Sequence, residues 1–181
     1  AGGFKEDKKE GPKTMGTGKP KFDYKKGANM EGKSKVEVAQ RMEELVASFD
    51  VKFDLNRYPY ELSGGQQQTA SIMRALAPKP EVLFLDEPFS ALDFEMTLFI
   101  REKLQDVFMQ TGTTMLLVSH DLEEAVYLAD QILLLTKRPT QVAEILDYND
   151  ARPRTIETLT QPSFIDAKKL SLEIFQREVR K

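Results

Sequence analysis

Two adjacent carboxylates that end an apolar run are the first residues in this sequence with clear chemical potential. The run from Val82 to Leu85 has the pattern of a short strand, and Asp86 and Glu87 follow it directly. Ligands of open α/β sheets bind beyond the carboxyl ends of the strands. At such an end, one carboxylate suits a magnesium site and a second can orient and activate an attacking water. A solvated strand end has the same pattern, so these residues alone leave both interpretations open.

A glycine-rich helix start lies ahead of the carboxylates, in residues 62–66, in front of a helical run that extends from residue 66 to 76. Ser63 is a good N-cap, because its hydroxyl can accept a hydrogen bond from a first-turn amide. Gly64 and Gly65 carry no Cβ, so a ligand can approach the backbone closely. Free amides and the positive end of the helix dipole together favour an anion. A plain capped helix would show the same residues.

Two further features follow the carboxylates. The tetrapeptide Ser90-Ala91-Leu92-Asp93 is by itself only a helix N-cap. His120 is the single histidine of the chain and comes just after the apolar run 114–118. A lone histidine is more often structural or simply exposed. At the carboxyl edge of a sheet, however, it would lie beside Asp86 and Glu87 and could donate to a phosphate oxygen.

Alternating helices and strands must position these residues. Apolar periodicity and capping signals predict helices over 35–49, 66–76, 94–110, 122–129 and 163–179. Short apolar runs predict strands over 81–85, 114–118, 131–136 and 142–146. We expect the first two strands to be parallel and buried, and the last two to be antiparallel neighbours. The order indicates a layered α/β domain with a mainly parallel sheet.

The composition excludes several classes of protein. Forty per cent of the 181 residues are hydrophobic and thirty per cent are charged, which is ordinary for a soluble globular protein. The chain has no cysteine and no apolar run of about 18 residues. Residues 1–35 hold ten lysines against five acidic residues, a net of +5 that leaves −8 on the rest of a chain whose total is −3. We expect a solvated basic tail rather than a nucleic-acid-binding surface.

Taken together, these four features resemble the ATP-binding cassette (ABC) ATPases in order and spacing over roughly residues 35–181. The features are the signature (Leu62, Ser63, Gly64, Gly65, Gln66), the Walker B strand with its catalytic glutamate (Val82 to Glu87), the D-loop (Ser90, Ala91, Leu92, Asp93) and the switch histidine (His120). The resemblance implies a P-loop-NTPase-like α/β fold that binds ATP and Mg²⁺.

The resemblance also implies a role for each feature. In this family two domains enclose two ATP molecules head to tail. The signature residues 62–66 would face the γ-phosphate of ATP held by the partner domain, and His120 would contact a γ-phosphate as well. Asp86 would bind magnesium, Glu87 would be the general base, and Asp93 would couple the two sites.

Finer features are similar to importer ATPases. Residues 58–61 precede the signature as in importers, and the strands near 131–146, followed by Arg152-Pro153-Arg154 and a terminal helix, resemble the nitrate/sulfonate/taurine type. The resemblance implies a second ABC ATPase domain and transmembrane permease subunits as partners, no nucleic acid, and a cytoplasmic location on the inner face of the membrane. Thr69 departs from the arginine common in the family, which puts a local salt bridge in doubt.

The phosphate-cradling P-loop of the family has only a poor candidate. Residues 27–34 fit its spacing, but the lysine-rich residues 19–26 do not read as the buried strand that the motif requires. Only 27 residues separate Ser34 from Leu62, too few for the remaining core strands, the Q-loop and a helical subdomain. We therefore interpret the match as coincidental and expect the chain to correspond to the C-terminal part of a cassette that binds ATP weakly or not at all by itself.

The sequence thus divides into four parts. They are a flexible Gly/Lys-rich segment (1–33), part of the helical subdomain with the signature (34–76), the α/β core with Walker B, D-loop and switch histidine (77–150), and a C-terminal extension with a helix (151–181).

Three functions are compatible with these motifs. The first is an ATPase subunit, or part of one, that powers solute import. The second is a truncated, non-catalytic cassette that contributes its signature to a partner's ATP site. The third, a DNA-repair or chromosome-structure ATPase, would carry long heptad coiled coils, and the sequence shows none.

Overall fold

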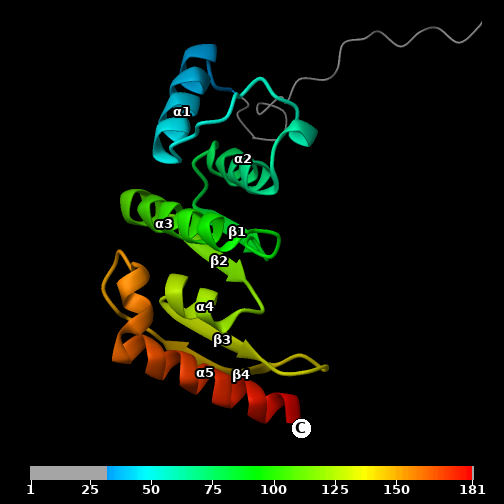
Figure 1. Ribbon diagram of the computed structural model, residues 1–181, viewed down its shortest axis with the longest axis vertical. Helices are drawn as coiled ribbons and strands as arrows, with labels where there is room; N and C mark the ends of the chain where they lie inside the picture. Colours follow the sequence, from blue (N-terminus) through cyan, green and yellow to red (C-terminus); the bar gives the residue numbers. More distant parts are fainter. Residues whose placement is uncertain (1–31, 181) are drawn as a thin grey trace, which may run out of the picture.

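The computed structural model describes residues 32–180, in which helices and strands alternate along the chain (Figure 1). The α-helices are α1 (Lys35–Ser48), α2 (Gly64–Leu76), α3 (Phe94–Thr111), α4 (Leu122–Leu128) and α5 (Pro162–Arg180), and short 3-10 helices are η1 (Pro59–Glu61) and η2 (Ile156–Thr160). The strands are β1 (Val82–Asp86), β2 (Thr114–Val118), β3 (Gln131–Leu135) and β4 (Val142–Asp147). The predicted helices and strands are all present, with ends that differ by at most two residues.

Local sequence signals account for several helix ends. Ser34 caps α1, and its hydroxyl and backbone exchange hydrogen bonds with Glu37 in the predicted capping box. Gly112 ends α3 in the left-handed conformation, with φ of +64°, which glycine adopts without steric cost.

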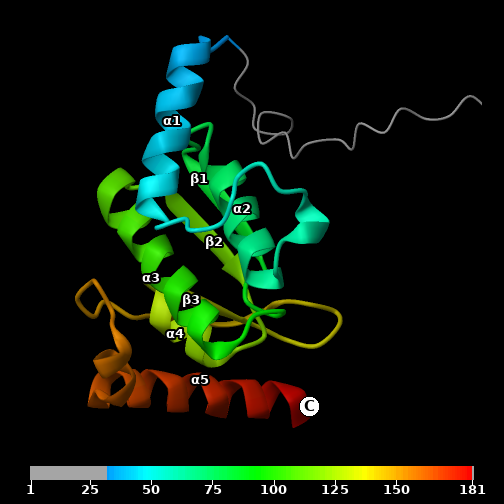
Figure 2. The same ribbon diagram turned by 45° about the horizontal axis from the view of Figure 1, so that its top comes forward.

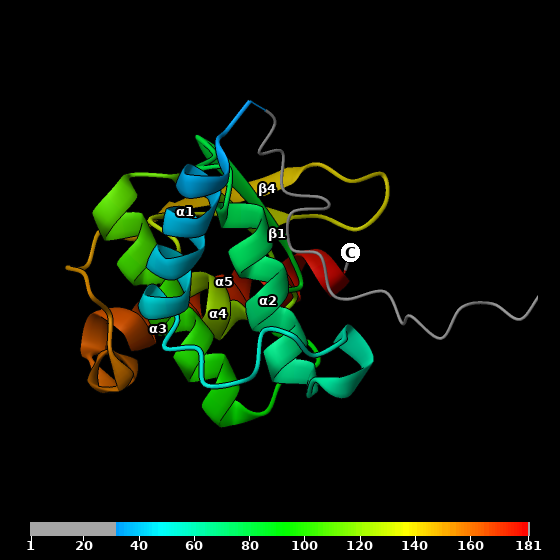
Figure 3. The ribbon, with the colours of Figure 1, turned by 90° about the horizontal axis from the view of Figure 1, so that it is seen from above.

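The elements form stacked layers. α1 and α2 lie at one end, α3 with β1 and β2 in the middle, and α4, the β3–β4 pair and α5 at the other end (Figures 1 and 2). Figure 3 shows α1 and α2 side by side over the layer that contains α3. One hydrophobic cluster joins α1, α2, α3 and β1, and a second joins α4, β3 and α5, with Leu128 packed against both.

The strands form two separate pairs. β1 and β2 are parallel, with Val82 opposite Thr114 and Asp86 opposite Val118. β3 and β4 are antiparallel, as predicted. The parallel sheet is therefore small, and α3 is the crossover helix that connects its two strands. A mixed α/β fold is confirmed.

The prediction that β1 and β2 are buried is wrong for one face of the sheet. Leu83 and Leu85 are buried against the helices, but Phe84 is 72% exposed and Leu116 is 50% exposed. The reason is that strands alternate their side chains between two faces, and among residues 32–180 the helices cover only one of them.

None of the helices in the described range is both long and apolar enough to cross a membrane.

Candidate functional site

The glycine-rich turn before α2 forms an N-terminal helix cap. Ser63 has extended backbone dihedrals, and its hydroxyl accepts from the Gln66 amide at 3.3 Å. The Gln66 side chain accepts in return from the Ser63 amide at 3.0 Å. The Gly64 and Gly65 amides, at the first two positions of the helix, have no acceptor within it. The N-cap predicted at Ser63 is confirmed. The Gly64 and Gly65 amides lie at the N-terminus of a 13-residue helix, which is the positive end of its dipole.

The same turn lies against the start of α3. A Cβ built on Gly64 would lie 3.8 Å from the Ala91 carbonyl oxygen, and one built on Gly65 would lie 2.9 Å from two carbons of Met96. A side chain at residue 65 would therefore require Met96 to move. The structure thus brings the signature and the segment 90–93 together, although they are far apart in the sequence.

The segment 90–93 is a tight connection between β1 and α3. The Ser90 amide and hydroxyl both donate to the Glu87 carbonyl, at 3.3 and 3.1 Å. Asp93 caps α3, and its carboxylate accepts from the Met96 amide at 2.9 Å. The sequence prediction of an N-cap at Asp93 is confirmed.

Glu87 continues β1 in an unusual conformation. Its amide donates to the Val118 carbonyl at 2.9 Å, which extends the parallel ladder by one step beyond Asp86. Its φ is +46°, a left-handed value that is uncommon for residues other than glycine, asparagine and aspartate. Such strained residues cluster at functional sites. Asp86, the preceding residue, is exposed at the strand end.

His120 and Glu87 are in direct contact. Nδ1 of His120 lies 2.7 Å from Oε2 of Glu87, while 78% of the histidine side chain stays exposed to solvent. The hydrogen bond with Glu87 and its negative charge raise the pKa of His120 above its ordinary value, and the charges of Glu124 and Asp121 act in the same direction. The predicted meeting of His120 with the carboxylate pair is confirmed for Glu87.

The described residues contain few candidate ligands for a metal ion that is not bound to a nucleotide. No group of three or more His, Cys, Asp or Glu side chains that could hold one occurs in residues 32–180. A nucleotide-bound magnesium ion needs only one or two protein carboxylates, because phosphate oxygens and waters fill its other positions. The exposed Asp86 carboxylate fits that case.

In the part of the chain that the structure describes, the signature makes no polar contact with Glu87 or His120. Within residues 32–180, no hydrogen bond or ion pair joins residues 62–66 to Glu87 or His120. Thr69, where the family commonly has arginine, is buried and donates to the Gly65 carbonyl at 2.9 Å.

The P-loop-like residues 27–34 lie mostly outside the described residues. Of them, Gly32 has φ of +82°, Lys33 lies 4.0 Å from Glu37, and Ser34 is the N-cap of α1.

Sequence analysis missed two buried arginines. Arg101 on α3 lies near Glu123 and Glu124, between the Phe89 and Tyr127 rings. Its position three residues before the buried Leu104 placed it on the apolar stripe of α3, which was the available signal.

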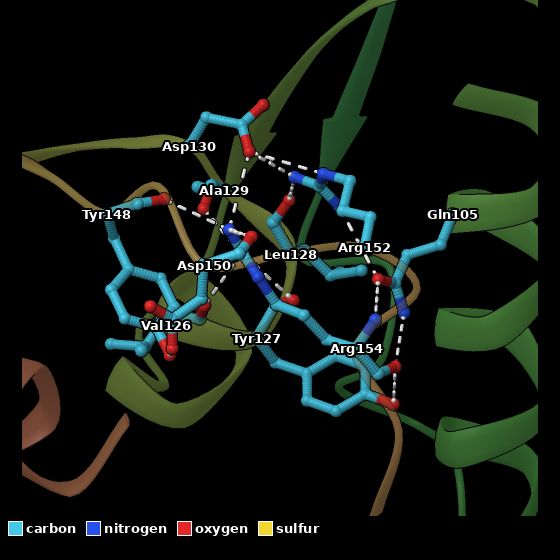
Figure 4. Close-up of polar contacts among 10 residues, drawn as sticks. All are labelled: Gln105, Val126, Tyr127, Leu128, Ala129, Asp130, Tyr148, Asp150, Arg152 and Arg154. Carbon is cyan, nitrogen blue, oxygen red and sulfur yellow. Dashed lines mark hydrogen bonds and ion pairs between the residues drawn. The ribbon is translucent and has the colours of Figure 1, made fainter. Parts of the chain in front are cut away.

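The second is Arg154, which the sequence analysis named only within the segment 152–154 and did not predict to be buried; it is fully buried beside the end of α4 (Figure 4). Its guanidinium donates to five carbonyl oxygens, those of Val126, Tyr127, Ala129, Tyr148 and Asp150. The neighbouring Arg152 donates to the Leu128 carbonyl at 2.5 Å and pairs with Asp130 at 2.7 Å. The C-terminal extension is thereby fixed to α4.

Comparison with known proteins identifies the family. A sequence model described as ABC transporter matches residues 6–90, which contain the signature and the carboxylate pair. This match begins well before residue 35, where we expected the resemblance to begin, although residues 6–31 lie outside the described part of the chain.

Several curated relatives are named as import ATP-binding proteins. The chain is 37% identical over 140 residues to the aliphatic sulfonates import ATP-binding protein SsuB of Bacillus subtilis. The matched residues cover 77% of this chain and 54% of SsuB. It is 34% identical over 141 residues to the nitrate import ATP-binding protein NrtC of Synechococcus elongatus, covering 77% of this chain and 21% of NrtC. The chain spans about half the length of SsuB.

A solved structure supports the same assignment. The dimeric ATP-binding cassette MJ0796, in a post-hydrolysis state bound to ADP and Pi, matches with a TM-score of 0.57 and 28% identity over 67% of this chain and 52% of that one. This chain belongs to the ATP-binding cassettes of ABC transporters and covers part of the cassette.

Proposed function

We propose that this chain is part of an ATP-hydrolysing subunit that powers solute import through an ABC transporter. The observation that carries the proposal is the contact between Glu87 and His120 at the carboxyl ends of two paired parallel strands. A base and a hydrogen-bond donor at that edge are parts that phosphoryl transfer requires. Relatives named for sulfonate and nitrate import support the direction of transport.

The carboxylates of Asp86 and Glu87 at the end of β1 would have different roles. Asp86 would hold Mg²⁺, which neutralises charge on the phosphates when it is bound. Glu87 would orient the attacking water and accept its proton. Its carboxylate contacts His120 at the end of β1, where its backbone has a φ of +46°.

His120 would donate to the transferred phosphate. Its Nδ1 faces Glu87, and the raised pKa favours the form in which both ring nitrogens carry hydrogen. Nε2 is then available as a donor in an imidazole that is mostly exposed. The role of orienting this ring falls to Glu87.

The signature would act on ATP held by a second cassette. The free amides of Gly64 and Gly65 at the start of α2 suit a phosphate group, and no interaction joins them to Glu87 or His120 within the described residues. Asp93 would couple the two sites. It lies two residues after Ala91, whose carbonyl oxygen would be 3.8 Å from a Cβ built on Gly64. The solved relative is likewise dimeric.

The remaining partners follow from the importer relatives. We expect the assembled subunit to lie on the inner, cytoplasmic face of the membrane through contact with permease subunits.

The test of this proposal is ATP turnover by the importer assembly that contains this chain. Glu87→Gln should lower turnover about 100-fold or more while ATP stays bound, because the amide cannot accept the proton of water. Glu81→Gln, at the exposed residue just before β1, is the matched control and should leave turnover unchanged. Unchanged turnover in Glu87→Gln would exclude Glu87 as the base.

A non-catalytic role is the second candidate, since the exposed Ser63 and Gly64 could serve a partner's ATP site whether or not Glu87 acts as a base. In that case the chain would stimulate ATP hydrolysis by a complete partner cassette. Ser63→Arg should abolish the stimulation, whereas Glu87→Gln should leave it intact. Loss of stimulation in both variants would favour the catalytic role instead.

A further inference from the structure

A buried arginine lies between the two loops that carry Glu87 and His120. Arg101 is on α3, and only 5% of its side chain is exposed. Burial of a guanidinium is costly unless charges and rings compensate for lost water. Its neighbours therefore show which parts of the molecule it holds.

One side of the arginine faces the loop after β1. The guanidinium carbon lies 5.6 Å from the centre of the Phe89 ring, which is buried and stands two residues after Glu87. The Phe89 carbonyl accepts from the Leu92 amide, and the Glu87 carbonyl accepts from Ser90. The position of the Phe89 ring is thus tied to the backbone turn that begins at Glu87.

The other side faces α4 and the loop before it. Nη2 of Arg101 lies 3.6 Å from the buried Glu124, and Nη1 lies 3.7 Å from Glu123. Glu124 accepts from the Ser119 hydroxyl at 2.5 Å, and the Ser119 oxygen accepts from the Asp121 amide at 3.0 Å. The residues on both sides of His120 are therefore held by this chain of contacts.

The charges around Arg101 are balanced by more than one group. Lys168 of α5 forms an ion pair with Glu123 at 2.7 Å. Glu124 is therefore the main carboxylate partner of Arg101. The Tyr127 ring, 5.4 Å from the guanidinium carbon, covers it on the α4 side. The planar guanidinium thus packs near two rings and lies within ion-pair distance of two carboxylates, while its Nε is buried without a hydrogen-bond partner among the described residues.

We infer that Arg101 is a positioning residue. It holds the turn after Glu87 and the loop around His120 in fixed relative positions, so that the side chains of Glu87 and His120 meet. It touches neither side chain itself and acts through Phe89 on one side and through Glu124 and Ser119 on the other. This inference rests on the proposed function for its importance in ATP hydrolysis, but the geometry that it describes can be tested without nucleotide.

The single histidine makes the test direct. Because His120 is the only histidine of the 181-residue chain, its ring C–H resonances in ¹H–¹³C spectra are unambiguous. Arg101→Met should move these resonances toward the positions that they take in Glu87→Gln, where the contact is lost. The same change made in the Glu87→Gln background should move them much less. Arg101→Lys, which keeps the charge, should restore part of the original positions.

Two control variants separate positioning from general destabilisation. Arg41→Met removes an arginine that donates to the Leu76 and Ala77 carbonyls, far from His120 in the sequence, and should leave the His120 resonances in place even if the chain becomes less stable. If Arg101→Met does not fold, Ser119→Ala should still move the resonances, while Ser171→Ala, which removes a fully buried hydroxyl of α5, should not.

The inference is overturned if the His120 resonances stay in place in folded Arg101→Met or, where that variant does not fold, in Ser119→Ala. An equal shift in the Glu87→Gln background also overturns it, because Arg101 would then act on His120 independently of the contact. Since the spectra are recorded without ATP, a failure here is distinguishable from unchanged turnover in Glu87→Gln, which would reject the proposed function instead.

Discussion

Glu87 and His120 stand 33 residues apart in the sequence, yet Oε2 of the glutamate lies 2.7 Å from Nδ1 of the histidine. The parallel register of β1 and β2 explains the contact, because Asp86 lies opposite Val118 and both strands end at the same edge. The contact raises the pKa of His120, chiefly through the hydrogen bond and then through the negative charge of Glu87.

The first prediction concerns this pKa. Glu87→Gln should lower the pKa of His120 toward its ordinary value, because the amide removes the negative charge that favours the imidazolium form. An NMR titration of the single histidine measures it. Glu81→Gln, just before the far end of β1, should not change the titration, and an unchanged pKa of His120 in Glu87→Gln would contradict the contact.

The second prediction concerns the packing of the signature turn against α3. Gly65→Ala should lower the free energy of unfolding by about 1 kcal/mol, since overpacking against Met96 costs more than the helix gains from alanine. Gly64→Ala, whose new methyl group would meet only the Ala91 oxygen at 3.8 Å, should not be destabilising. Urea denaturation of both variants makes the comparison, and equal losses of stability would count against this packing.

Much of this arrangement could be predicted from sequence, because the signals are local. The helix caps at Ser34, Ser63 and Asp93 depend on residues within one turn, and the structure has all three. The carboxyl ends of β1 and β2 follow from short apolar runs that stop at polar residues.

Burial and long-range contacts were harder to predict. Phe84 reads as a core residue in an apolar run, but whether it is buried depends on what covers the sheet, which a strand pattern does not specify. Arg101 and Arg154 look like surface residues by type. Their burial depends on rings and carbonyl groups that other elements supply.

The third prediction compares the two faces of β1. Leu83→Ala should cost about 2–5 kcal/mol of unfolding free energy, because it leaves a cavity among buried side chains. Phe84→Ala should cost less than about 0.5 kcal/mol, since its ring is mostly exposed. Urea denaturation of the 181-residue chain measures both values. A larger loss for Phe84→Ala would show that this face is covered in the chain as it stands.

The fourth prediction concerns the fully buried Arg154. Arg154→Met should lower the unfolding free energy by about 3 kcal/mol or more, because it leaves the carbonyl groups at the end of α4 without their donor. Arg138→Met, at an exposed position in the loop between β3 and β4, should stay within about 0.5 kcal/mol of the unchanged chain. Similar stabilities for the two variants would contradict the proposed role of Arg154 in fixing the extension.

The central proposal is that Glu87, His120 and the signature are parts of a composite ATP site, and that residues 27–34 do not act as its phosphate-cradling loop. Calorimetric titration of the 181-residue chain with ATP and magnesium tests it most directly. We expect weak binding or none, and no effect of Lys33→Ala, whose ammonium lies near Glu37 at the start of α1. Micromolar binding that Lys33→Ala abolishes would contradict the claim, because residues 27–34 would then be a working P-loop.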